Sequence, residues 1–127
     1  MQFQQTIPVY LPFGFSWEEE KEEERDRKVM QSFYSRTAAR IQEKVERECD
    51  RMEYDGSIMF DEYPDKRMME HLCGKIEREM EAEDAREDGG LARILEAGCG
   101  FRDLIGVLLF NEMYRRRCRH RKYHWIR

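Results

Sequence analysis

Hydrophobic residues recur along residues 30–52 at the spacing of one helix face. From Met30 to Met52 the steps between apolar positions are 4, 4, 3, 4, 4 and 3. This spacing predicts a single apolar stripe, close to a heptad seam. Its members are Met30, Tyr34, Ala38, Ile41, Val45, Cys49 and Met52. We therefore predict helices over residues 17–34 and 36–53, with a break near Ser35, which suits an N-cap.

A second stripe begins after the turn signal Asp55-Gly56. It contains Met68, Met69, Leu72, Cys73, Ile76 and Met80. Pro64 suits the first turn of a helix. The pattern predicts a helix over about 64–82 that pairs antiparallel with helix 36–53. The connection before it is too apolar to stay in water, so we expect it to fold back through Ile58, Met59, Phe60 and Tyr63.

The most hydrophobic segment is the seven-residue run Leu104–Phe110. A membrane-spanning helix needs about 20 apolar residues, so this run is too short to span. It predicts a bundle helix over 101–119 that is apolar on nearly all sides and therefore surrounded by other helices. A helix lying in a membrane interface is an alternative. A short helix is also predicted at Leu91–Ala97.

The first fifteen residues are apolar and aromatic, and their two prolines exclude a regular helix. We predict an extended apolar arm over residues 1–15, followed by a helical bundle domain over residues 16–127. The arm either packs over the domain or docks in a groove of a partner or a neighbouring copy. The candidate partner-binding residues are Tyr10, Leu11, Phe13, Phe15 and Trp17.

Composition supports the helical prediction. Charged residues make up 39% of the chain and hydrophobic residues 40%, with only 3 prolines and 8 glycines. A disordered polyampholyte would contain fewer apolar residues. The predicted fold class is all-α: a small bundle of four or five helices with an extended N-terminal arm and a basic C-terminal tail.

Charge is distributed unevenly along the chain. Residues 115–127 carry seven Lys/Arg and no acid, whereas the other 114 residues carry 16 Lys/Arg against 27 Asp/Glu. Basic residues mixed with Tyr123 and Trp125 suit phosphate contacts and base stacking. The acidic body and the lack of a reading motif argue against sequence-specific binding. The candidate nucleic-acid-binding residues are Arg115, Arg116, Arg117, Arg119, Arg121 and Lys122.

Three possible metal ligands lie in the same segment: Cys118, His120 and His124. A structural zinc site needs four ligands, and the neighbouring cations oppose a dication. We therefore predict no metal and no cofactor. No nucleophile–base pattern or phosphate loop is present, so we expect no catalytic residues. The four cysteines form no CxxC pair and no secretory signal precedes them, which predicts reduced thiols and a cytoplasmic protein.

Two stretches, "RIQEKVERECDRMEYDGSIMFDEYPDK" and "LLFNEMYRRRCRHR", resemble a group of short uncharacterised helical proteins from anaerobic, spore-forming bacteria. The resemblance spans about residues 36–70 and 104–121. It implies a bacterial, intracellular, helical protein made around sporulation. That group has no established activity, so the resemblance carries over no catalytic residues.

Taken together, these patterns predict a non-enzymatic interaction or assembly protein. It would self-associate as a homo-oligomer or dock a protein partner. The alternative is a nucleic-acid-associated accessory protein that binds phosphates through the basic tail. No transmembrane segment is expected.

Overall fold

The computed structural model describes residues 17–86 and 100–126, with side chains described for 17–84 and 100–122. These residues form an all-α structure, as predicted. The arm over residues 1–15 and the predicted helix at Leu91–Ala97 lie outside the described residues. The elements, in chain order, are α2 (Trp17–Gln31), α3 (Arg36–Met52), the 3₁₀ helix η2 (Ile58–Phe60), α4 (Lys66–Arg86) and α6 (Gly100–Ile126).

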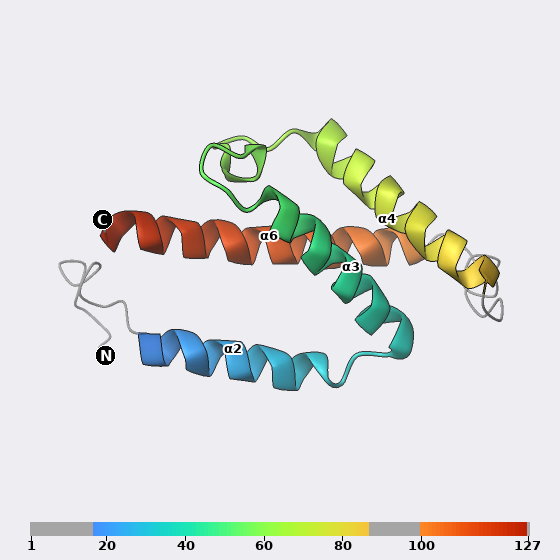
Figure 1. Ribbon diagram of the computed structural model, residues 1–127, viewed down its shortest axis with the longest axis horizontal. Coiled ribbons are helices and arrows are strands. Elements are labelled where there is room, and N and C mark those ends of the chain that lie inside the picture. Colours follow the sequence, from blue (N-terminus) through green and yellow to red (C-terminus); the bar gives the residue numbers. More distant parts are fainter. Residues whose placement is uncertain (1–16, 87–99, 127) are drawn as a thin grey trace.

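Helix α6 is the long axis of the bundle (Figure 1). Figure 1 shows α2 running antiparallel along one side of α6 and α4 along the other side, while α3 crosses it. Helix α3 contacts both α4 and α6, and η2 packs on α6. The predicted antiparallel pairing of helix 36–53 with the next helix is confirmed as the α3–α4 pair.

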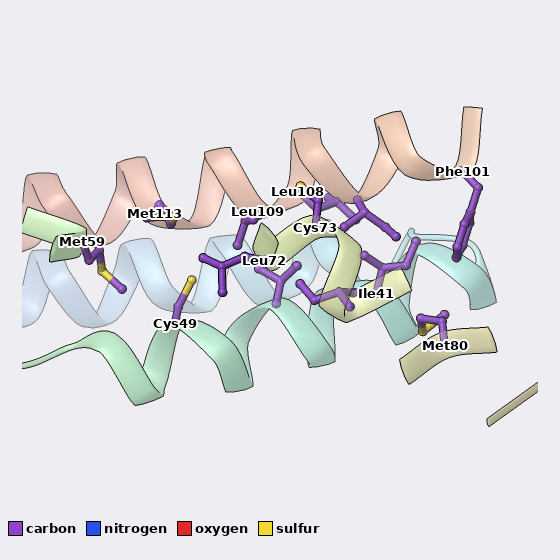
Figure 2. Packing of buried hydrophobic residues seen from close by; sticks show 13 residues of the cluster. Ile41, Cys49, Met59, Leu72, Cys73, Met80, Phe101, Leu108, Leu109 and Met113 are labelled. Carbon is purple, nitrogen blue, oxygen red and sulfur yellow. The ribbon is translucent and has the colours of Figure 1, made fainter. Parts of the chain in front are cut away.

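The core lies between α3, α4, α6 and η2 (Figure 2). Most of its residues come from the stripes that the sequence predicted, because a 3.6-residue period keeps them on one face of each helix. Burying each large side chain contributes about 1.5–3 kcal/mol. The buried residues are Ile41, Val45, Cys49, Met59, Leu72, Cys73, Ile76, Met80, Phe101, Ile105, Leu108, Leu109 and Met113.

Local signals set the helix boundaries. Ser35 has an extended backbone and its Oγ accepts a hydrogen bond from the Ala38 amide at 3.2 Å, which starts α3 as predicted. Gly56 has a φ of 85°, the left-handed conformation that glycine adopts without strain. Asp65 Oδ1 accepts from the Arg67 amide at 3.1 Å and so caps the start of α4.

Three expectations were wrong in detail. Helix α6 does not end near residue 119 but continues to Ile126, so the basic segment is helical in the described residues. Within the described residues, α6 is also not surrounded by other helices, because Val107, Phe110 and Tyr114 on one of its faces are exposed. In the connection, Met59 is buried and Phe60 packs on the core, whereas Ile58 and Tyr63 are exposed.

Candidate functional site

The basic residues of α6 face acidic groups of the neighbouring elements. Arg116 is buried, and its Nη1 donates to Asp50 Oδ1 at 2.7 Å and to Glu53 Oε1 at 2.5 Å. Its Nε donates to Glu112 Oε2 at 2.7 Å, one helical turn away. These charge-assisted hydrogen bonds tie the second half of α6 to the end of α3.

Glu112 is buried beside Arg116 and is also held by Arg115 and Gln42. Arg115 Nη2 donates to Glu112 Oε2 at 2.5 Å, and Gln42 Nε2 donates to Glu112 Oε1 at 3.3 Å. Burial alone would raise the pKa of Glu112, but the hydrogen bonds from Arg115 and Arg116 outweigh it and lower this pKa to about 2. Burial opposes the charge of Arg116 too, yet its bonds to Glu112 and Asp50 leave its pKa raised. Both groups are therefore ionised at neutral pH.

The next basic residues are also engaged within the molecule. Arg117 Nη1 donates to the carbonyl oxygens of Met59 at 2.7 Å and Asp61 at 2.6 Å, which fixes the connection against α6. Arg119 Nη2 donates to Glu53 Oε2 at 2.8 Å. These contacts use donors that a nucleic-acid phosphate would otherwise take.

The last two candidates for nucleic-acid binding lie further along the same helix. Lys122 Nζ lies 3.7 Å from Glu20 Oε1 of α2. Arg121 is exposed, and its Nη2 donates to Cys118 Sγ at 3.4 Å. Of the six candidates, Arg121 therefore presents the guanidinium that is most open to solvent.

Of the three possible metal ligands, the structure describes the side chains of Cys118 and His120. The His120 ring stacks on Phe60, with ring centroids 3.9 Å apart and planes 10° from parallel. Cys118 is half-buried, and the side chain of His124 lies outside the described residues. Among the described residues, no group of three or more His, Cys, Asp or Glu is placed to hold a metal ion.

Two of the four cysteines belong to the core. Cys49 and Cys73 are buried free thiols. Burial raises the pKa of Cys49 to about 12, with Arg116 opposing the shift, and burial also raises the pKa of Cys73. Both are protonated at neutral pH and act as small apolar side chains.

One face of α6 carries a row of six residues that we call the outer stripe, and all of them except the half-buried Arg117 are exposed. Its apolar centre consists of Val107, Phe110 and Tyr114, whose exposed fractions are 63%, 48% and 64%. The steps along the row are 4, 3, 4, 3 and 4, the spacing of a heptad seam. The whole outer stripe is Asp103, Val107, Phe110, Tyr114, Arg117 and Arg121.

A groove of about 900 Å³ runs between the outer stripe and α4. Met69 and Cys73 form its α4 wall, and Gly106 lies at its base on α6. A Cβ at Gly106 would lie 3.9 Å from Cys73 Sγ, an ordinary van der Waals contact, so α6 passes close to α4 at this position. The lining residues are Lys66, Met69, Glu70, Cys73, Arg102, Asp103, Gly106, Val107 and Phe110.

The structure describes only one of the five residues that were predicted to bind a partner. Tyr10, Leu11, Phe13 and Phe15 lie outside the described residues. Trp17 is the first residue of α2 and is exposed. The exposed aromatic and aliphatic surface of the described chain therefore includes Trp17 as well as the outer stripe.

Fold and site together define a small all-α bundle that carries a linear apolar face next to an apolar groove. None of the family models, curated proteins or solved structures compared with the chain matches it. No helix of the described residues has the length and apolar content needed to cross a bilayer.

Sequence reasoning missed both central features of the site. The Glu112–Arg116 spacing of four residues was visible, but apolar neighbours alone do not show that a charged pair is buried. The 4, 3, 4 steps from Asp103 to Tyr114 were visible as well. These steps did not stand out, because the surrounding segment is so rich in apolar residues that it predicted a helix buried on all sides.

Proposed function

We propose that this chain is a non-enzymatic interaction or assembly protein that binds protein through the outer stripe of α6. The observation that carries the proposal is the continuous exposure of Val107, Phe110 and Tyr114 on one helix face. Single exposed apolar side chains are common on folded proteins and need no explanation. A contiguous row beside an apolar groove is typical of a contact surface.

The neighbouring α4 enlarges this surface. Met69 packs against the core while also lining the groove, and the Cys73 side chain lines it from the same helix. A partner helix lying on the outer stripe could place side chains into the groove, as in helix-in-groove recognition. The arm over residues 1–15 and Trp17 are further contact candidates of the proposed function.

Nucleic-acid binding through the basic segment has less support. Arg116 and Arg119 would have to give up acidic partners, and Arg117 would have to give up backbone carbonyls, before binding phosphates. The resemblance of residues 36–70 and 104–121 is the support for placing the role in the cytoplasm of a spore-forming bacterium, around sporulation.

Site-specific photo-cross-linking tests the proposed function. A benzophenone amino acid replaces Phe110 in the full chain, and a matched chain carries it at Phe33, which is 75% exposed in the turn after α2. We expect irradiation in cells to give a specific protein adduct from position 110 and none from position 33. Equal labelling from both positions, or none from either, would contradict the proposal. Mass spectrometry of the adduct identifies the partner as another protein or as a second copy.

A further inference from the structure

We infer that the partner of the outer stripe is the same stripe of a second copy, packed antiparallel to form a homodimer. This inference rests on the proposed function, and it names the protein that the outer stripe binds. Three observations carry it: the spacing of the stripe, the distribution of charge along it, and the groove beside it.

The spacing favours a helix as the partner. Side chains at alternating steps of 4 and 3 residues form a row that a second helix can meet with interdigitating side chains. On α6 this row keeps the heptad spacing from Asp103 to Arg121. The uncharged, proline-containing arm over residues 1–15 has no such repeat.

The charges favour an antiparallel copy. The outer stripe begins with the exposed acid Asp103 and ends with the exposed base Arg121. A parallel copy would place like charges against each other at both ends, which disfavours association. An antiparallel copy places Asp103 against Arg121 of the second copy at both ends.

One register aligns the aromatic positions and the charged ends together, and it places Val107 opposite Arg117 of the second copy. Phe110 and Tyr114 are centred on residue 112, and so are Asp103 and Arg121. An antiparallel pair with its two-fold axis at residue 112 therefore stacks Phe110 on Tyr114 of the second copy while it closes both ion pairs. Aromatic pairs of this kind contribute beyond the area they bury.

The groove accommodates the remainder of the contact. Val107 and Phe110 border it on α6, and Met69 and Cys73 line it on α4. An aromatic side chain from the second copy can enter it without displacing a buried charge, because the Glu112–Arg116 pair lies on the core side of α6.

Sedimentation equilibrium of the full chain gives the first test. We expect a dimer for the natural sequence. Phe110→Glu should weaken dimerisation about thirtyfold or more, the size of an interface hot spot. Phe33→Glu is the matched control and should leave the dimer unchanged. Circular dichroism verifies that both variants keep their helix content.

Charge reversal tests the antiparallel register. Asp103→Arg and Arg121→Asp should each weaken the dimer about tenfold through like-charge contacts. The double variant exchanges the two signs and should restore the natural affinity. A double variant as weak as either single variant would overturn the antiparallel arrangement.

Other outcomes overturn the inference outright. A monomer at all concentrations, or a dimer that Phe110→Glu leaves intact, rules out self-pairing through this face. A dimer lost only when residues 1–15 are deleted assigns the contact to the arm. If the chain is monomeric and position 110 cross-links to a different protein, the self-pairing fails but the proposed function stands.

Discussion

Glu112 and Arg116 form a buried ion pair one helical turn apart on α6. The hydrogen-bond partners around this pair decide what it contributes to the fold. Taking two charges out of water costs several kcal/mol for each ion, and the pair recovers this only when hydrogen bonds are complete. Gln42 and Arg115 supply the further partners of Glu112, and Asp50 and Glu53 supply those of Arg116. The pair therefore contributes mainly to specificity, because other packings of α6 against α3 would leave one of the charges unpaired.

The substitution Glu112→Gln tests how much the Glu112–Arg116 pair contributes to the folded structure. We expect Glu112→Gln to lower the free energy of unfolding by about 3 kcal/mol at pH 7, because the fold loses the buried carboxylate that accepts charge-assisted hydrogen bonds from Arg115 and Arg116. The matched control is Glu43→Gln, whose carboxylate is exposed and pairs with Arg47 on the surface at 3.6 Å. This control should change stability by less than about 1 kcal/mol. Urea denaturation measures both.

The same pair predicts how stability depends on pH. The folded pKa of Glu112 is about 2, below its ordinary value of 4.5. Its contribution is therefore fully present above pH 4.5 and is lost as the pH falls from 4.5 toward 2. The difference in unfolding free energy between the natural chain and Glu112→Gln should shrink over this window. If this difference in unfolding free energy stayed constant over the window, ionisation of the Glu112 carboxylate would not be its source.

Among the elements, α2 is held differently from the others. It buries no residue, and its contacts with α6 are ion pairs across a charged groove of about 520 Å³. Arg27 Nη1 lies 3.6 Å from Glu46 and 3.9 Å from Glu112, and this nitrogen makes no hydrogen bond to the described residues. Ion pairs rather than buried apolar side chains are therefore the described contacts that hold α2 against the bundle.

Salt should therefore loosen α2 selectively. Raising NaCl from 0.05 to 0.5 M shortens the screening length to a few ångströms and weakens such pairs. We expect amide hydrogen exchange in residues 17–31 to accelerate several-fold, while exchange in α3 and α6 changes little. Hydrogen–deuterium exchange with peptide-level mass spectrometry measures both. Equal acceleration throughout would mean that α2 belongs to the same cooperative unit as the core.

The sequence predicted these elements with uneven success. The stripe from Ile41 to Cys49 identified α3 and its buried face. Periodicity reports which positions share a face, so it worked where each helix has one apolar face. It failed on α6, because an all-round apolar segment does not reveal which side has a neighbour.

For the molecule as a whole, the core depends on α3, α4 and α6 and not on α2. Among the residues that the structure describes, the core cluster includes none before Tyr34. We expect a chain starting at residue 32 to keep a cooperative thermal transition, with a loss of stability limited to the surface ion pairs. A chain that stops at residue 99 should lack such a transition, because α6 supplies Phe101, Ile105, Leu108, Leu109 and Met113. Circular dichroism melting distinguishes the two chains.

The charge asymmetry of the chain also acts at this scale. The basic segment faces the acidic residues of α2, α3 and the connection, so the two ends of the sequence attract each other within one molecule. Sequence alone permitted this arrangement and also head-to-tail assembly between copies. The structure of the single chain shows the first, and the apolar centre of the outer stripe takes no part in these ion pairs.

The position of α6 in the chain has a consequence for biosynthesis. Helices α3 and α4 leave the ribosome before α6 has been made, so the sides they later turn toward it stay uncovered during translation. Arg116 and Arg117, which fasten the connection, are made later still. The bundle therefore closes only after its central helix emerges, and until then the unfinished helical pair leaves apolar surface uncovered.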